Sequence, residues 1–394
     1  MLGLRTVMAA AARVKMGSGE YGIWEGLSQS MKKVMKKRIL FYTAAIAASV
    51  LILIFLQALL MPKYMTSIPE GNLVEEYYRD TKDHDVIFVG DCEVFSNVSP
   101  VKLWEDYGIT SYIRGSAQQL PWQSYYLLEE TLKYEKPRVV VFNVLAMKYN
   151  EPQKEAYNRL TLDGMRLSPT KIRAVNASMT EGESLMTYLF PLLRYHSRWS
   201  ELTSEDINYV FHRDKLSHNG YLMRVDVKPA GQIPRAKKLG DYRFGKNAYD
   251  YLDRMTKLCK ENGIELLLIK SPSIYPYWYG EWDQQMVDYA EKNGLTYINF
   301  LPEAEKLGID YEKDTFDGGL HLNLSGAEKF TDRLGEVLHE EYGLKDHRNN
   351  KRLCDLWQKK IDFYDSMREN QEQELRKYGY LKSYSTFEEK GSAE

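Results

Sequence analysis

The stretch VIFVGDCEVFSN, residues 86–97, decides the fold. Four apolar residues, 86–89, run into Gly90, Asp91 and Cys92 before the chain turns polar. This pattern is typical of a buried strand that ends in a tight turn and lifts one side chain clear of the sheet. That side chain belongs to one of only three cysteines in the chain. The sequence therefore points to a thiol with a specific task at the end of the first strand.

From residue 85 onward, short apolar runs alternate with longer helical patterns. We predict strands at residues 86–89, 110–113, 138–142, 264–269 and 296–300, and helices near residues 121–134, 246–262, 281–293 and 324–342. Gly263 and Gly294 stand directly before the fourth and fifth runs, where glycine commonly ends a helix. Apolar strands separated by helices indicate a parallel sheet covered on both faces. The prediction is a three-layer α/β/α sandwich with a five-stranded, mostly parallel sheet of flavodoxin-like type, binding ligands at the carboxyl ends of its strands.

Composition restricts the classes of protein that fit. The 394 residues, 44% of them hydrophobic, suffice for one large domain with appendages. The 53 Lys and Arg nearly balance the 55 Asp and Glu, so no basic domain predicts nucleic-acid binding. Three cysteines permit at most one disulfide, which excludes a small scaffold held together by disulfides.

Residues 39–61, ILFYTAAIAASVLILIFLQALLM, carry no charge and exceed the ~20 residues that a membrane-spanning helix needs. Five basic residues precede the stretch directly: Lys32, Lys33, Lys36, Lys37 and Arg38. The positive-inside rule then places the N-terminus in the cytoplasm and the rest outside. A cleaved signal peptide is the alternative, but it would have a shorter apolar region and a small-x-small cleavage site, which LQALLMPKY lacks. We predict an uncleaved single-pass anchor in the cell membrane.

These features divide the chain. The predicted parts are a cytoplasmic tail (1–38), a transmembrane helix (39–61), a stalk (62–84), an extracytoplasmic domain (85–345) and a C-terminal helical extension (346–394). Residues 144–245 are too long for a single crossover between strands, so they are predicted to form an insertion. The C-terminal extension carries apolar residues at helical spacing, which predicts an amphipathic helix docked on the domain.

Chemically useful residues follow several of the predicted strands. Cys92 follows the first strand, Gly115 the second and Asn143 the third, and His321 lies in DTFDGGLHLNLSG, residues 314–326. Since the carboxyl ends of parallel strands meet at one edge of a sheet, we expect a thiol, an imidazole and polar donors to gather there. The residue that orients His321 stays open at this point. It is Asp317, Asp314 or neither, in which case the site is a dyad.

The same residues resemble the four sequence blocks of the SGNH (GDSL-type) hydrolase superfamily, over roughly residues 85–345. The matching positions are Gly90-Asp91-Cys92 for Gly-Asp-Ser, Gly115, Asn143, and His321 with Asn323 and Gly326 in the last block. Two positions depart from the family pattern. Cys92 replaces the nucleophilic serine, and Gly318 stands where the family has an acid three residues before the histidine.

Within that superfamily, the anchor and the GDCEV sequence look most like cell-envelope acyl-transfer proteins, the DltD-type proteins and the alginate or peptidoglycan O-acetyltransferases. This resemblance implies an acyltransferase or esterase that acts on an envelope polysaccharide or teichoic-acid-type polymer. It also implies a multipass membrane acyltransferase as partner. The alternative is a catalytically degenerate protein of the same fold that binds or scaffolds for such a partner.

The resemblance assigns roles to individual residues. Cys92 is the expected nucleophile, His321 the base and Asp317 its orienting acid. Gly115 and Asn143 are expected to donate to the oxyanion, with Asp91, Glu93 and Asp314 in support. A cysteine at the start of a helix is expected to have a lowered thiol pKa. The covalent intermediate would be a thioester, which favours transfer of the acyl group over simple hydrolysis.

Two further stretches allow a binding role or a purely structural one. PLLRYHSRW, residues 191–199, brings together Arg194, His196 and Arg198, which either grip an anionic or sugar acceptor or form salt bridges along an amphipathic helix. SPSIYPYWYGEW, residues 271–282, offers Tyr277 and Trp278 for stacking on a sugar or for packing. No metal or cofactor is predicted, because the seven histidines lack ligand spacing and no nucleotide-binding fingerprint is present.

Overall fold

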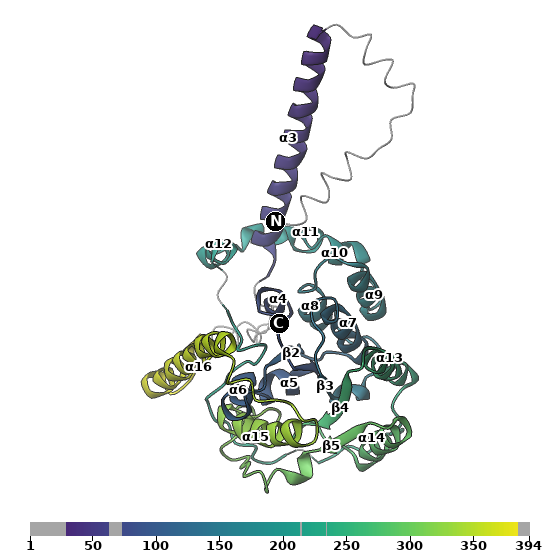
Figure 1. Ribbon diagram of the computed structural model, residues 1–394, viewed down its shortest axis with the longest axis vertical. Coiled ribbons are helices and arrows are strands. Elements are labelled where there is room, and N and C mark those ends of the chain that lie inside the picture. The colour runs from purple at the N-terminus through teal and green to yellow at the C-terminus, as the bar shows by residue number, and fades with distance from the viewer. Residues whose placement is uncertain (1–28, 63–72, 213–214, 234, 385–394) are drawn as a thin grey trace. The chain divides into compact units, whose positions relative to one another are not determined.

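The computed structural model describes residues 29–62, 73–212, 215–233 and 235–384 (Figure 1). It divides into two compact units, Met1–Leu59 and Leu60–Glu394. Residues 1–28 of the predicted cytoplasmic tail, residues 63–72 of the predicted stalk and residues 385–394 of the predicted C-terminal extension lie outside the described residues.

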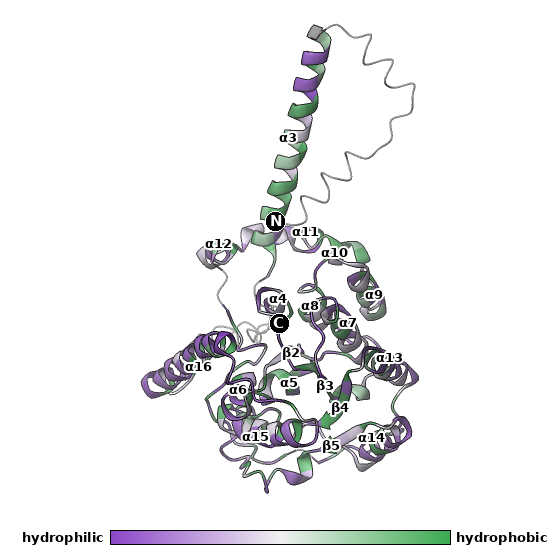
Figure 2. Ribbon diagram, viewed as in Figure 1, coloured by the Kyte–Doolittle hydropathy of each residue, from purple (hydrophilic) through white to green (hydrophobic). Residues whose placement is uncertain are grey.

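The first unit contains most of one long helix, α3 (Gln29–Leu60). Figure 2 shows its hydrophilic start and the hydrophobic run that follows. Among the described residues, Met31–Leu60 is the one helix long and apolar enough to cross a membrane. Its length and composition suit both a membrane anchor and a signal sequence.

The second unit is built on one five-stranded parallel sheet. Its strands are β1 (Val86–Gly90), β2 (Ser111–Gly115), β3 (Val139–Asn143), β4 (Glu265–Lys270) and β5 (Thr296–Asn299), in the spatial order β2-β1-β3-β4-β5. All five predicted strands are present, with their ends shifted by at most one residue, or by two at the end of β2. The predicted fold class is confirmed.

Alternate residues of each strand point to opposite faces, and each face has its own core. Phe88 and Val141 belong to one apolar cluster, which α5 (Cys92–Asn97), α6 (Pro100–Tyr107) and α15 (Leu324–Glu340) cover. Val89 and Phe142 belong to the other, which α7 (Pro121–Thr131), α13 (Lys246–Asn262) and α14 (Gly280–Asn293) cover. This gives the three layers of the sandwich.

Two glycines end helices as expected. Gly263 and Gly294 adopt left-handed φ values of 61° and 65° as the C-caps of α13 and α14. Each therefore turns the chain from a helix into the following strand at no steric cost.

The segment between β3 and β4 is mostly short helices. They are η2 (Val144–Lys148), α8 (Glu155–Leu162), α9 (Pro169–Ser178), α10 (Leu185–Leu189), α11 (Leu192–Tyr195), η3 (His196–Ser200) and α12 (Ser204–Phe211). Residues of α8 and α9 share a third apolar cluster with α7. The insertion therefore rests on the helical layer rather than extending the sheet.

The C-terminal helix α16 (Lys351–Tyr378) packs against α6. Trp357 stacks on Trp104 with ring centroids 5.2 Å apart, and the Lys360 Nζ lies 2.8 Å from the Asp80 Oδ1. Asp80 directly follows α4 (Leu73–Glu76) and η1 (Tyr77–Arg79), so the end of the chain is tied to the segment that precedes the sheet.

Candidate active site

The turn after β1 presents Cys92 at the first position of α5. Asp91 is the N-cap of this helix, and its Oδ1 accepts a hydrogen bond from the Glu93 N–H at 3.2 Å. Gly90 has a φ of 153°, and a Cβ there would lie 3.1 Å from the Cβ of Asn143. Only glycine fits this position without strain, because backbone and neighbouring strand approach so closely. Gly115 pairs with Gly90 at the end of β2.

His321 is held by a loop that coils back on itself. Gly318 and Gly319 adopt positive φ values of 82° and 94°. The turn that they form allows the Asp317 carboxylate to reach the backbone and the ring of His321. The Asp317 Oδ1 accepts from the His321 N–H at 2.8 Å, and its Oδ2 lies 2.5 Å from the His321 Nδ1. The loop is thus one residue longer than in the family pattern, and its carboxylate still reaches the imidazole.

The imidazole ring is fixed from its face as well. Phe316 stacks on His321 with ring centroids 5.7 Å apart and an interplanar angle of 15°. The Arg224 guanidinium lies 4.6 Å from the centroid of the Phe316 ring. The His321 Nε2 is buried and completes no hydrogen bond with any described residue. Its hydrogen-bonding capacity therefore remains for the thiol or for a bound reactant.

Cys92 and His321 lie close enough for the charge of each to influence the other, although 228 residues lie between them in the chain. Burial raises the pKa of the Cys92 thiol; His321 opposes this rise, and Asp91 and Glu93 add to it. Burial lowers the pKa of the His321 imidazole, but the Cys92 charge and the Asp317 hydrogen bond outweigh it, and the net direction is well above the ordinary value. The expected lowering of the thiol pKa is therefore wrong. Two carboxylates and burial outweigh the start of the helix.

Asn143, the other residue expected to donate to the oxyanion, makes three hydrogen bonds within the protein. Its Nδ2 donates to the Asp91 Oδ1 at 3.2 Å and to the Glu93 Oε2 at 2.8 Å. Its Oδ1 accepts from the Ser271 N–H at 3.3 Å. Both amide hydrogens are thus used within the protein, and Asn143 ties β3 to the start of α5 and to the end of β4.

Lys270 is a site residue that the sequence analysis missed. It is fully buried at the end of β4, and its Nζ lies 2.8 Å from the Oε1 of the equally buried Glu93. Burial raises the pKa of Glu93, which Lys270 opposes. The available signal was a lysine at the end of the otherwise apolar run IELLLIK. This ion pair lies one residue from the candidate nucleophile.

Two other residues near the site differ from expectation. Asp314 does not orient His321. Its Oδ2 lies 2.6 Å from the Lys329 Nζ and accepts from the Asp310 N–H at 2.8 Å. Tyr149 was not predicted, yet burial and the charges of Asp91 and Cys92 raise the pKa of its phenol. Tyr149 therefore belongs to the surroundings of the thiol.

The five candidates for acceptor binding make contacts within the insertion and around α14, or are exposed. Arg194 pairs with Glu155 at 3.1 Å, Arg198 pairs with Asp206 at 3.3 Å, and a ring nitrogen of His196 lies 3.0 Å from the Leu193 carbonyl. Trp278 is buried and its Nε1 donates to Asp283, whereas Tyr277 is exposed. Among the contacts of the described residues, none joins these five side chains to Cys92 or His321.

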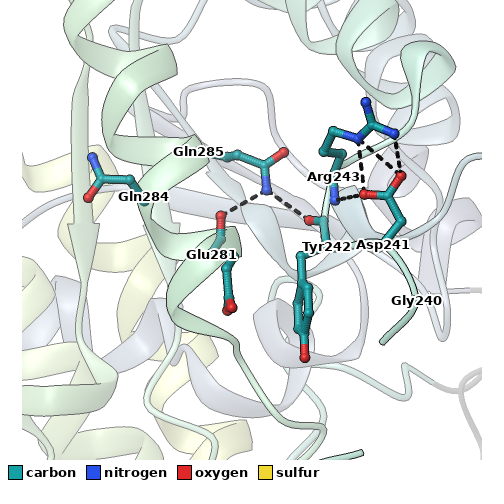
Figure 3. Close-up of a pocket in the computed structure, with 7 residues that line it drawn as sticks. All are labelled: Gly240, Asp241, Tyr242, Arg243, Glu281, Gln284 and Gln285. Atoms are coloured by element: carbon teal, nitrogen blue, oxygen red, sulfur yellow. Dashed lines mark hydrogen bonds and ion pairs between the residues drawn. The ribbon is translucent and has the colours of Figure 1, made fainter. Parts of the chain in front are cut away.

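The lining of a cavity of about 510 Å³ includes none of Cys92, Asp317 and His321 (Figure 3). The cavity is lined by residues 240–243 and by Glu281, Gln284 and Gln285. Its polar groups largely satisfy one another: Arg243 pairs with Asp241, and the Gln285 Nε2 donates to the carbonyls of Tyr242 and Glu281. Within the described residues, no group of three or more His, Cys, Asp or Glu side chains is arranged to hold a metal ion.

Comparison with known proteins gives no family. No family model matches the chain, and no curated protein matches it. One solved structure that matches is a protein from Desulfitobacterium hafniense DCB-2 described as lipolytic and of the G-D-S-L family. The match has 12% sequence identity and a TM-score of 0.31, and it covers 64% of this chain and 98% of that chain. A protein from Bacteroides fragilis NCTC 9343 described as an acylhydrolase matches with 12% identity and a TM-score of 0.32. That match covers 66% of this chain and 89% of the other. A GDSL-like lipase from Bacteroides thetaiotaomicron VPI-5482 has 11% identity, coverages of 69% and 100% and a TM-score of 0.33. At these scores the similarity carries no argument about activity, which rests on the geometry of the site.

Proposed function

We propose that this protein is a membrane-anchored, extracytoplasmic acyl-transfer enzyme of the SGNH type, with Cys92 as its nucleophile. The observation that carries the proposal is the Asp317 carboxylate on the His321 Nδ1, together with a buried His321 Nε2 and electrostatic coupling between His321 and Cys92. Cys92 lies early in the sequence of the second unit, and Asp317 and His321 lie more than 220 residues later. A nucleophile, a base and an acid that orients the base are the parts that covalent acyl transfer requires.

The proposed reaction has two steps. In the first, the Cys92 sulfur attacks the carbonyl carbon of an acyl ester while His321 takes the thiol proton. The proton then passes to the departing alcohol oxygen, and a thioester remains on Cys92. In the second, a hydroxyl of the acceptor polymer attacks the thioester, gives its proton to His321 and restores the thiol. Asp317 holds the imidazole in one tautomer through its Nδ1 contact.

The oxyanion is assigned to backbone donors in this proposal. The Cys92 N–H is at the first turn of α5, where helix N–H groups have no partner within the helix. The Gly115 N–H is assigned as the second donor. Removing one such donor typically costs about 3–4 kcal/mol of barrier. The acceptor is proposed to be an envelope polysaccharide or teichoic-acid-type polymer, and a multipass membrane acyltransferase is proposed to supply the acyl group.

One observation favours a second candidate, a non-catalytic binding or scaffold protein of the same fold. Burial raises the pKa of the Cys92 thiol, and inert structural cysteines show the same behaviour. The experiment below is designed to separate the two.

The test treats the full-length protein with p-nitrophenyl acetate and measures the acetyl adduct by mass spectrometry. We expect an adduct on Cys92 that neutral hydroxylamine removes, as it removes thioesters. Cys92→Ala abolishes the adduct, and Cys354→Ser, which removes another partly buried thiol, leaves it unchanged. In cells, Cys92→Ala lowers polymer acylation. Wild-type protein that forms no adduct, with cellular acylation unaffected by Cys92→Ala, supports the scaffold instead.

A further inference from the structure

One end of the insertion carries a concentration of exposed apolar side chains. Outside α3, the described residues include thirteen large apolar side chains that are exposed, and six of them fall within residues 186–211. These six, here called the insertion patch, are Met186, Phe190, Leu193, Trp199, Ile207 and Phe211. They lie on α10, α11, η3 and α12 or directly beside them, which Figure 1 shows along one end of the unit.

The insertion patch is too apolar for an ordinary protein surface. Trp199 is 73% exposed, Leu193 54% and Phe190 51%. Single exposed apolar residues are common on protein surfaces, but a cluster of them marks a site that binds a membrane or another protein. Tryptophan is enriched at membrane–water interfaces, and Trp, Phe and Leu form the apolar face of helices that lie there.

The position of Leu60 indicates that the insertion patch faces a membrane. Leu60 is the last residue of the membrane-length stretch and the first of the second unit. Within that unit Leu60 is buried, and its carbonyl accepts from the Arg198 Nη1 at 2.7 Å. Trp199 is the next residue, and consecutive Cα atoms are about 3.8 Å apart. If residues 31–60 span a bilayer, the insertion patch therefore begins at its surface.

Charge argues against an electrostatic mode of attachment. Residues 185–212 contain two arginines and three acidic residues. Arg194 pairs with Glu155, and Arg198 pairs with Asp206 while holding Leu60. No excess of positive charge is available for anionic headgroups, so the apolar side chains have to supply the attraction.

We infer that the insertion patch inserts into the outer surface of the lipid bilayer and docks the second unit on the membrane that its own helix anchors. The inference rests on the anchoring part of the proposed function and is independent of the chemistry at Cys92. Because apolar burial drives the docking, zwitterionic lipid suffices and salt does not reverse it.

The test uses the full chain in phosphatidylcholine vesicles with ordinary or brominated acyl chains, since bromine quenches tryptophan fluorescence on contact. We expect brominated lipid to quench part of the emission of the wild-type protein. Trp199→Phe loses that part, and the control Trp282→Phe, which removes a half-buried tryptophan of α14, retains it. A second variant, Phe190→Ser with Leu193→Ser, keeps Trp199 but removes two apolar side chains of the patch. We expect brominated lipid no longer to quench the emission of Trp199 in this variant. Added salt changes none of these results.

Flotation of the same vesicles reports anchoring separately, so a failed anchor is distinguished from failed docking. Equal quenching in the wild-type and Trp199→Phe proteins, with both floating, overturns the inference. Shielding of Trp199 from aqueous quenchers in native membranes but not in pure lipid also overturns it, and assigns the patch to a membrane protein.

Discussion

Cys92 combines two properties that usually occur apart. It stands at the start of a helix, where thiols tend to ionise readily. Its burial and the negative charges of Asp91 and Glu93 oppose ionisation of the thiol. Because His321 partly offsets these effects, formation of the thiolate and protonation of the imidazole favour one another. The arrangement suits a nucleophile that is activated when a substrate arrives rather than one that stays ionised.

The first prediction concerns the pH dependence of Cys92. The thiol pKa is raised, so the alkylation rate of Cys92 by iodoacetamide should rise with pH only above the ordinary range near 8.5. Asp91→Asn removes a negative charge and keeps an N-capping side chain, so it should shift the rate profile to lower pH. His321→Ala should shift it to higher pH. Shifts of the opposite sign would contradict the electrostatic account.

The second prediction separates the two aspartates of the histidine loop. Asp317→Asn should lower the rate of Cys92 acylation by about 10²- to 10⁴-fold, because an amide no longer fixes the imidazole tautomer. Asp314→Asn is the matched control, since Asp314 contacts Lys329 and the Asp310 N–H instead. Its acylation rate should stay within a few-fold of wild type. Equal losses in the two variants would refute the assignment.

At the scale of elements, local signals account for the predicted sheet, whereas long-range pairing accounts for what was missed. Gly263 and Gly294 mark where helices end, and the apolar run at residues 86–89 marks β1, so these elements are readable from a few neighbouring residues. Lys270 could not be assigned, because a lysine after a strand normally faces solvent. Its role depends on Glu93, 177 residues away. The Asn143 contacts likewise depend on side chains from other strand ends.

The ion pair between β4 and α5 leads to the third prediction. Lys270→Met leaves the Glu93 carboxylate buried without its cation, which should destabilise the protein by about 3–5 kcal/mol. Glu93→Gln combined with Lys270→Met should recover part of this loss, because no unpaired charge remains. Thermal unfolding in detergent measures both. A double variant no more stable than Lys270→Met would show that the charge pair is not the cause.

The fourth prediction concerns the attachment of α16. Asp80 is buried between Lys360 and Lys215; burial raises its pKa, but the two lysines outweigh this and hold the pKa well below its usual range. A carboxyl with a lowered pKa stabilises the folded state above its ordinary pKa, near 4, and this contribution is lost as the pH falls. Asp80→Asn should cost about 3 kcal/mol at neutral pH. The difference from wild type should shrink progressively below about pH 4. A difference that is constant with pH would contradict the ion-pair explanation.

At the scale of the whole molecule, the fold follows from the order of strands, and the sequence was sufficient to predict it. The insertion was harder, because its short helices pack mainly on α7 and carry little periodicity of their own. Arg194 pairs with Glu155 and Arg198 with Asp206, which are contacts of the kind that the structural alternative describes. The contact of Arg198 with the Leu60 carbonyl had no counterpart in the sequence pattern.

The fifth prediction is the topology of the chain. The basic residues before α3 should keep the N-terminus in the cytoplasm and export the second unit. A protease added outside spheroplasts should therefore digest an epitope placed after residue 384 and spare one placed at residue 1. Reversal of the basic residues to Glu should reduce the exported fraction. A cleaved product that begins near residue 62 would indicate a signal peptide instead.

The contact between Cys92 and His321 also has a consequence for biosynthesis. The thiol leaves the ribosome early, whereas the imidazole and the loop that carries it appear only after all five strands of the sheet have been made. If Cys92 and His321 act as proposed, a chain that ends before this loop has the sulfur without its base and does not transfer acyl groups. In the proposed mechanism, activity therefore begins only after the loop that follows the last strand has been made.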